Sequence, residues 1–149
     1  MAHYVAHVES TMSPTAAFDY VADVRRFADW DPRVLESLQV EGSGPEFGAE
    51  YDVTFSGGGH EIRLHYVVRS IERPRRIEIV GTSRFLTSID VITVAAHDAG
   101  SFITYDARLR LPLVFKLFDP LLSIVFRRIG DESADGLAEA LGGRLLGHR

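Results

Sequence analysis

The sequence predicts an α+β domain in which a curved antiparallel sheet of about seven strands, in the order β-α-α-β6-α, wraps around one long C-terminal helix. Two helix-start signals, Ser13-Pro14 and Asp119-Pro120, lie near opposite ends of the chain. Between them, residues 35–111 alternate apolar and polar side chains and are divided by short turns. Such a sheet has one apolar face that must be covered, and the long helix is the element able to cover it.

Composition and length limit the classes of protein to consider. We expect a single domain spanning residues 1–149. The formal net charge of −5 comes with no basic stripe, which argues against a nucleic acid partner. The absence of cysteine excludes disulfides, thiolate metal sites and cysteine nucleophiles. The N-terminus lacks the features of an export signal and no apolar run reaches about 18 residues, so we expect no transmembrane segment and a cytoplasmic location.

The N-terminal segment predicts one strand and two helices. Residues from Tyr4 to Ser10 alternate weakly and indicate a first strand. Ser13-Pro14 then provides a helix N-cap and a proline at the first helical position, and the helix extends to about Asp23. Residues 24–30 form a second short helix or a turn, which ends before Pro32 because a proline disfavours the α conformation of the preceding residue.

Six further strands follow the two helices. Their apolar alternation is centred on residues 38–40, 51–55, 62–68, 77–79, 86–95 and 103–111. The strand at 62–68 has the clearest division into two faces, with Ile62, Leu64, Tyr66 and Val68 predicted inward and His65 outward. The strand at 86–95 is apolar on both faces, so its alternation leaves the orientation of Asp90 open.

The C-terminal helix is predicted to begin at Asp119-Pro120 and to run to about Leu146, a length of roughly 40 Å at 1.5 Å per residue. One narrow stripe of the helical wheel carries Phe118, Leu122, Val125, Ile129, Ser133, Gly136 and Ala140. Its first half is bulky and its second half is small. Since small residues allow a closer approach to the sheet, the taper predicts a wedge-shaped gap that is open at the bulky end.

This order of elements resembles the helix-grip fold of the START-like (SRPBCC) superfamily, which includes polyketide cyclases/dehydratases, lipid-transfer domains, Bet v 1-like proteins and coenzyme Q-binding proteins. The residues that carry the resemblance are Ser13-Pro14, residues 18–23 (FDYVAD), 27–32 (FADWDP) and 90–94 (DVITV), the turn after Ala99-Gly100, and residues 118–130 (FDPLLSIVFRRIG). The resemblance covers essentially the full chain. It implies an apolar cavity between sheet and helix, and it implies no particular activity, because the superfamily shares a cavity and not a catalytic motif.

The segment SGGGHEIRLH, residues 56–65, is interpreted as a glycine-rich β-hairpin. A zinc site of the HExxH type needs two histidines four residues apart on a helix, whereas His60 and His65 are five apart in a strand and face opposite sides. A phosphate-binding loop would be followed by a helix, and here a strand follows. We therefore expect no metal and no cofactor. His60 is left as a rim residue that either accepts a proton or is simply half-solvated.

Several other residues have both a functional and a structural interpretation. Asp90 is either an inward acid or base with a raised pKa, or a carboxylate that accepts backbone hydrogen bonds. Arg128 and Glu132, four residues apart, either anchor a ligand or form a surface pair. Trp30 either stacks on a ligand or anchors the helix pair. The apolar segment 113–126 exceeds what one stripe can bury, which indicates a cavity mouth, a homodimer contact or a membrane surface.

Three functions are compatible with these patterns. The leading hypothesis is binding or carriage of a small hydrophobic ligand, such as a lipid, an isoprenoid or an aromatic polyketide-like molecule. The alternatives are a cyclase/dehydratase-type enzyme, with His60 and Asp90 as candidate catalytic residues, and a protein-interaction module that uses residues 113–126. The residues predicted to bind the ligand are Trp30, Tyr51, Phe55, Ile62, Leu64, Tyr66, Val68, Tyr105, Leu109, Leu121, Leu122, Val125, Arg128 and Ile129.

Overall fold

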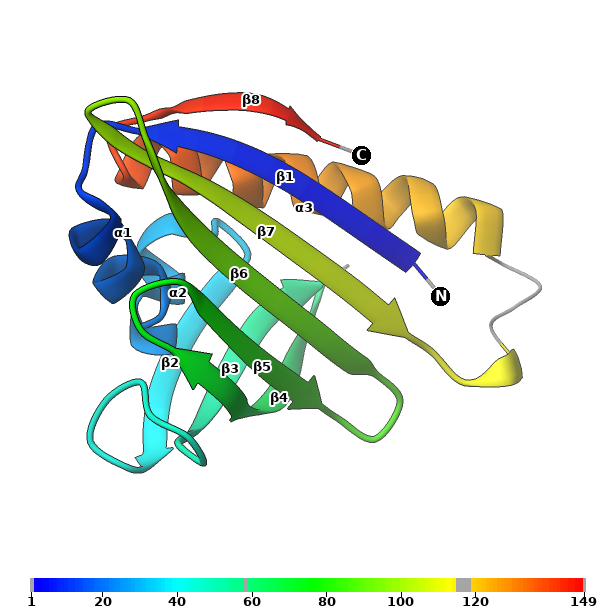
Figure 1. The fold of residues 1–149 in the computed structure, drawn as a ribbon. Coiled ribbons are helices and arrows are strands. Elements are labelled where there is room, and N and C mark those ends of the chain that lie inside the picture. Colours follow the sequence, from blue (N-terminus) through cyan, green and yellow to red (C-terminus); the bar gives the residue numbers. More distant parts are fainter. Residues whose placement is uncertain (1, 58, 115–118, 149) are drawn as a thin grey trace.

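The computed structural model describes residues 2–57, 59–114 and 119–148, apart from the side chains at positions 119, 122, 123 and 148. A strongly curved sheet has the long helix α3 running along it and two short helices at one end (Figure 1). The elements are β1 (Ala2–Ser10), α1 (Pro14–Val21), the 3-10 helix η1 (Val24–Arg26), α2 (Phe27–Trp30), β2 (Val34–Glu41), β3 (Glu50–Gly57), β4 (His60–Glu72), β5 (Arg76–Thr82), β6 (Thr87–His97), β7 (Gly100–Arg110), α3 (Asp119–Ala140) and β8 (Arg144–His148).

The sheet contains eight antiparallel strands in the order β2-β3-β4-β5-β6-β7-β1-β8. Strands β2 to β7 form a meander in which each strand pairs with the next one along the chain. Strand β1 pairs with β7, placing Ala6 opposite Tyr105. The predicted fold class, a curved antiparallel sheet with a long C-terminal helix packed against it, is confirmed.

The C-terminal end of the chain differs from the expectation. Helix α3 ends at Ala140 and not near Leu146. The backbone N–H of Gly143 donates to the carbonyl of Ala138 (2.8 Å), and Gly142 adopts a φ of +59°. A left-handed residue just past the last turn ends a helix, and glycine adopts that conformation without steric cost. The chain then reverses and adds β8 beside β1, which is the strand that the alternation did not predict.

The hydrophobic core fills the space between the sheet and the C-terminal half of α3, on the side where α1 and α2 lie. Its largest fully buried side chains include Phe18, Val21, Ile77, Ile79, Ile92, Leu137 and Leu141. The N-terminal half of α3 is less covered, since Leu121 and Ile124 are 62% and 68% exposed. Within the described ranges, no helix combines the length and the hydropathy needed to span a membrane.

Small residues let the second half of α3 lie very close to its neighbours, in agreement with the predicted taper. A Cβ atom added at Gly136 would lie 1.9 Å from the backbone oxygen of Trp30. A Cβ atom added at Gly130 would lie 2.6 Å from the ring of Tyr4 in β1. The helix is therefore held tightly at its small end, and the cavity described below lies beside its middle turns. The predicted opening at the bulky end involves Phe118 and Leu122, whose side chains lie outside the described part of the structure.

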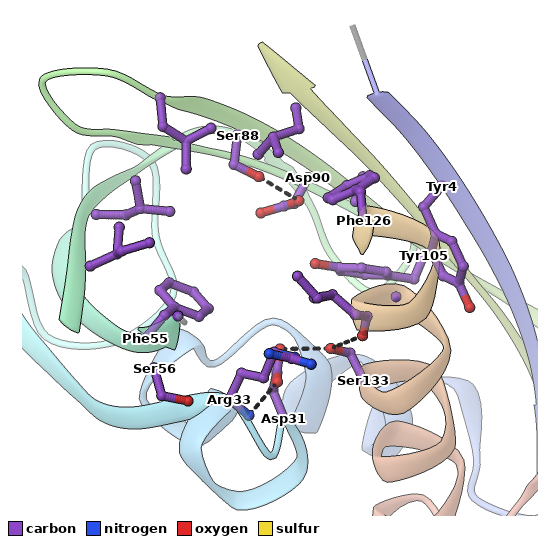
Figure 2. A pocket seen from close by; sticks show the side chains of 18 of the residues that line it. Tyr4, Asp31, Arg33, Phe55, Ser56, Ser88, Asp90, Tyr105, Phe126 and Ser133 are labelled. Carbon is purple, nitrogen blue, oxygen red and sulfur yellow. Dashed lines mark hydrogen bonds between the residues drawn. The ribbon is translucent and has the colours of Figure 1, made fainter. Parts of the chain in front are cut away.

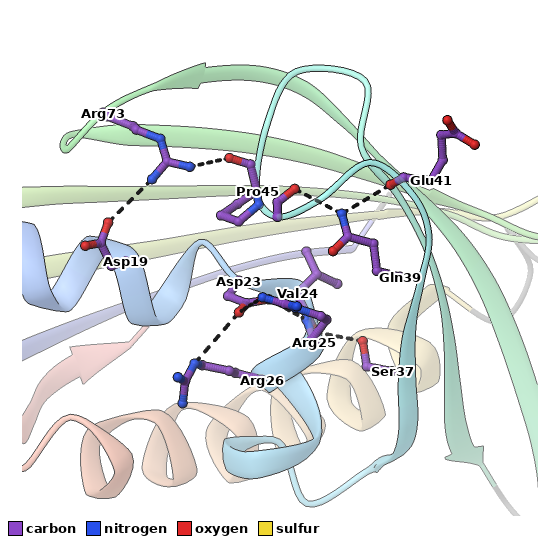
Figure 3. Close-up of polar contacts among 11 residues, drawn as sticks. Asp19, Asp23, Val24, Arg25, Arg26, Ser37, Gln39, Glu41, Pro45 and Arg73 are labelled. Carbon is purple, nitrogen blue, oxygen red and sulfur yellow. Dashed lines mark hydrogen bonds and ion pairs between the residues drawn. The ribbon is translucent and has the colours of Figure 1, made fainter.

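Polar contacts fix the segment that joins the short helices to the edge of the sheet (Figure 3). Asp23 accepts hydrogen bonds from the backbone N–H of Arg25 (3.1 Å) and from its guanidinium (2.8 Å). Ser37 Oγ in β2 donates to the carbonyl of Val24 in η1 (2.7 Å). These bonds hold the backbone between η1 and β2, and this backbone carries two of the cavity residues described below.

Replacing Gly136 by alanine is expected to destabilise the fold strongly. The new methyl group would meet a backbone oxygen that cannot move without shifting α2. We therefore expect the free energy of unfolding to fall by ~1–3 kcal/mol. Urea denaturation measures this loss. The matched control is Gly147→Ala, because a Cβ atom at Gly147 meets nothing within 4 Å. Equal stabilities of the two variants would contradict the tight contact.

Candidate functional site

A cavity of about 180 Å³ lies between the inner face of the sheet and the middle of α3. Most of its wall is apolar, and Figure 2 shows the side chains that point into it. Several residues predicted from the sequence lie on this wall, namely Phe55, Ile62, Leu64, Tyr66, Asp90, Tyr105, Leu109 and Ile129. They come from strands β3, β4, β6 and β7 and from one face of α3. Ile62, Leu64 and Tyr66 in β4 thus face inward, as the alternation of that strand predicts.

The remaining predicted ligand residues lie elsewhere. Trp30, Tyr51 and Val68 belong to the hydrophobic core and do not line the cavity; the Trp30 ring packs edge-on against Tyr105, with 6.0 Å between ring centroids. The other three residues with described side chains are at the surface: Leu121 is 62% exposed, Val125 is 49% exposed, and the Arg128 side chain is 82% exposed. The side chain of Leu122 lies outside the described part of the structure.

The SGGGHEIRLH segment forms the predicted hairpin between β3 and β4, with Gly57 paired to His60. His60 is exposed and does not line the cavity. His65 faces the opposite side of the sheet, where its ring nitrogens lie 2.8 Å from Asp52 Oδ1 and 3.0 Å from Glu50 Oε2. The hydrogen bond to Asp52 is the main cause of a raised pKa for His65. Both histidines thus lie away from the cavity.

The structure settles the facing of β6. Ser88, Asp90, Ile92 and Val94 are buried, so Asp90 points inward, where it lines the cavity at 1% exposure. Ser88 Oγ donates to Asp90 Oδ1 at 3.1 Å. Among the described residues, the second carboxyl oxygen of Asp90, Oδ2, has no hydrogen-bond partner. In this buried carboxyl group, therefore, only Oδ1 has a hydrogen-bond partner among the described residues.

Burial raises the pKa of Asp90 to about 7, because the charged carboxylate is poorly solvated in this environment. The neighbouring hydroxyls of Ser88, Tyr66 and Tyr105 oppose this shift, because they favour the charged carboxylate. Burial also raises the pKa of both tyrosines, so their hydroxyls stay neutral. The sheet side of the cavity therefore carries an acid that titrates near neutral pH beside two neutral hydroxyls.

A second polar group, on the opposite side, was missed by the sequence analysis. Asp31 accepts hydrogen bonds from the Arg33 backbone N–H and from Ser133 Oγ, both at 2.9 Å. The Arg33 guanidinium binds Glu132 Oε2 at 2.9 Å, while its buried Nε has no partner among the described residues. Burial raises the pKa of Asp31 as well. The sequence of the Asp31-Pro32 turn predicts a helix end, but it does not show that the turn borders a cavity.

One other cluster contains metal-binding residue types. Glu9, His97 and Asp98 place their possible ligand atoms within 4.8 Å of one another, the one such group among the described residues. His97 pairs with Glu9 at 3.3 Å, and Glu9 also binds Arg144 at 3.1 Å. The side chains of His97 and Asp98 are exposed, that of Glu9 is partly buried, and none of the three lines the cavity. Ion pairing accounts for this surface cluster, and we assign no metal to it.

Comparison with known proteins identifies the family. Residues 1–142 match the family described as polyketide cyclase/dehydrase and lipid transport, and the chain belongs to it. The START-like resemblance is therefore confirmed, and membership of this family suggests binding of a hydrophobic ligand. Among curated proteins, no sequence matches the chain.

Solved structures support the same fold. A START superfamily protein from Mycobacterium smegmatis is 12% identical with a TM-score of 0.79, covering 95% of this chain and 98% of its own. The TTHA0849 protein from Thermus thermophilus is 12% identical with a TM-score of 0.75, covering 94% and 95%. Ara h 8.0201 is 15% identical with a TM-score of 0.60, covering 92% and 97%. At these identities the likeness concerns the fold alone.

The raised pKa of Asp90 predicts that stability falls between pH 4 and pH 7. The folded state holds the proton up to about pH 7, whereas the unfolded chain releases it near 3.8, so the native state is progressively penalised across this window. The full effect is on the order of 4 kcal/mol at ~1.4 kcal/mol per pKa unit. In urea denaturation measured at several pH values, Asp90→Asn should not show this fall in unfolding free energy between pH 4 and pH 7. Asp98→Asn, at a side chain that is 84% exposed, should keep it; parallel pH profiles for all three proteins would contradict the assignment.

Proposed function

We propose, on the premise that the chain belongs to the polyketide cyclase/dehydrase and lipid transport family, that it binds and carries a small hydrophobic molecule in the cavity between the sheet and α3. The observation that carries the proposal is the apolar cavity itself. Protein interiors are normally close-packed with few voids larger than a water molecule, so a cavity of this size favours a binding site. Polar groups enter the cavity from Asp90 and Tyr105 on one side and from Arg33 on the other. They would orient the ligand in the way that a few polar groups orient ligands in apolar pockets.

The size of the cavity limits the ligand. An apolar cavity of about 150 Å³ accommodates a benzene molecule, and this one has about 180 Å³. A single ring with small substituents therefore fits inside. An isoprenoid, a lipid or a polyketide-like molecule would place one end inside and extend past the rim, where Ile62 is 40% exposed.

Filling the cavity should abolish binding without unfolding the protein. Ala107 lies on the cavity wall in β7 and is 6% exposed, so Ala107→Leu would put three additional carbon atoms into the space. We expect wild-type protein to retain a ligand in native mass spectrometry and Ala107→Leu to lose it, with an affinity at least about tenfold weaker. The control is Ala95→Leu in β6, where the side chain is exposed. Retention by Ala107→Leu equal to that of wild type would refute this site.

A second candidate function, cyclase/dehydratase-type catalysis, is favoured by one observation. Asp90 is a buried carboxyl group whose pKa lies at about 7, which suits a general acid or base at neutral pH. As a carboxylate it would take a proton from the carbon next to a ketone; the electrons of the broken C–H bond would form the enolate, and the proton would be held on Asp90. The neutral hydroxyls of Tyr66 and Tyr105 would donate hydrogen bonds to the enolate oxygen.

Deuterium exchange into 2-indanone, a compact ketone, tests this chemistry. In D2O the wild-type protein should accelerate exchange of the hydrogens next to the carbonyl, with a rate that rises as pH passes through about 7 and the carboxylate forms. Asp90→Asn should bind 2-indanone but exchange it only at the buffer rate, while Asp98→Asn should match wild type. If bound 2-indanone exchanges no faster than in buffer, the cavity binds ligands without this chemistry.

A further inference from the structure

Two residues that line the cavity each carry an unsatisfied polar atom. Among the described residues, the buried side-chain atoms without a hydrogen-bond partner are Trp30 Nε1, Arg33 Nε, Tyr51 Oη, Asp90 Oδ2 and Ser101 Oγ. Of these residues, Arg33 and Asp90 line the cavity and the others do not. Buried polar groups in native proteins nearly always have partners, so each exception needs an explanation. A bound molecule with two polar groups would provide the missing hydrogen-bond partner for both atoms.

The two atoms differ in what they require. Asp90 Oδ2 accepts a hydrogen bond when the carboxyl group is ionised and can donate one when it is protonated. Because the pKa of Asp90 lies at about 7, both states are populated near neutral pH. A ligand hydroxyl satisfies either state, since it is both donor and acceptor. Arg33 Nε is a donor in every state and requires an acceptor oxygen.

The charges around Arg33 favour an uncharged acceptor. Its guanidinium is already paired with Glu132, and the Asp31 carboxyl group accepts a hydrogen bond from its backbone N–H. A ligand carboxylate placed here would add a third acidic group beside Glu132 and Asp31. Arg33 supplies the only guanidinium on the described cavity wall, since Arg128 pairs with Glu132 from the surface. A neutral carbonyl oxygen accepts the Nε–H without adding charge. Figure 2 shows Asp90 and Arg33 on opposite sides of the cavity, so the two ligand groups must lie at opposite ends.

We propose that the ligand, or the part of it inside the cavity, is a compact uncharged hydroxy-carbonyl compound, with its hydroxyl at Asp90 and its carbonyl oxygen at Arg33. This inference rests on the proposed function and specifies its ligand class. The apolar walls hold the hydrocarbon between the two polar groups, and the approximately 180 Å³ of space accommodates about one ring.

Four benzene derivatives with nearly equal shapes test the proposal: 4-hydroxyacetophenone, 4-methylacetophenone, 4-isopropylphenol and 4-isopropyltoluene, each with its meta isomer. They combine a hydroxyl or a methyl group with an acetyl or an isopropyl group. Dissociation constants from NMR titration at pH 7 should fall by about tenfold or more for each polar group introduced, because its apolar counterpart leaves a buried protein group unpaired. The hydroxy ketone should bind most tightly.

Variants assign each preference to its residue. Asp90→Leu should remove the preference for hydroxyl over methyl and keep the preference for acetyl, and Arg33→Met should do the reverse. Ser101→Ala is the matched control, because it removes a buried unpaired oxygen that does not line the cavity, and it should change neither preference. A hydroxyl preference that survives Asp90→Leu would overturn the assignment. The wild-type titrations decide the ligand class even where a variant fails to fold.

The outcomes separate this inference from the proposed function. If 4-isopropyltoluene binds at least as tightly as 4-hydroxyacetophenone, the hydroxy-carbonyl inference is wrong and the apolar cavity remains a binding site. If none of the compounds shifts the resonances of cavity residues, and native mass spectrometry detects no retained ligand, then both proposals fail.

Discussion

The contact between Gly136 of α3 and the backbone oxygen of Trp30 is the constraint on which the rest of the structure depends. No larger residue fits at that point, so the helix and the α2 segment are held at the smallest possible separation. On the preceding turns, Phe126, Ile129, Gly130 and Ser133 line the cavity. The cavity therefore lies beside the middle turns of the helix, next to its point of closest approach.

The same contact positions the polar groups of the cavity. Trp30 ends α2, and the next three residues carry Asp31 and Arg33 to the cavity wall. Asp31 is fixed by Ser133, one turn before Gly136 on α3. The sheet contributes Asp90 independently, from the middle of β6. A wall with one titrating carboxyl group and two neutral hydroxyls thus faces an ion-paired wall, and neither wall provides a partner for the unpaired atom of the other. In the proposed complex, one molecule that lies between them would do so.

Much of the fold could be predicted from the sequence, because alternation and helix-start signals are local. The inward row of Leu64 and Tyr66 follows directly from the two-residue period of a strand, and the glycine-rich segment before it was correctly interpreted as a hairpin. The facing of β6 could not be predicted, since both of its faces are apolar. The exposure of Leu121 and Val125 depends on how far α3 stands from the sheet, which is a tertiary property. Arg33 and Asp31 were missed because a turn sequence does not reveal which space it borders.

The strand that the sequence did not predict, β8, also determines how the domain presents itself to other copies. By pairing with β1 it occupies a row of backbone donors and acceptors that would otherwise be open to another strand. The sheet is then left with β2 as its other edge. That strand carries Glu36 and Glu41, and its pairing with β3 shifts register beside both residues. Charges and irregular register both discourage edge-to-edge association. The C-terminal strand therefore replaces part of a long sheet edge with a short one, and a short edge gives another strand fewer groups to pair with.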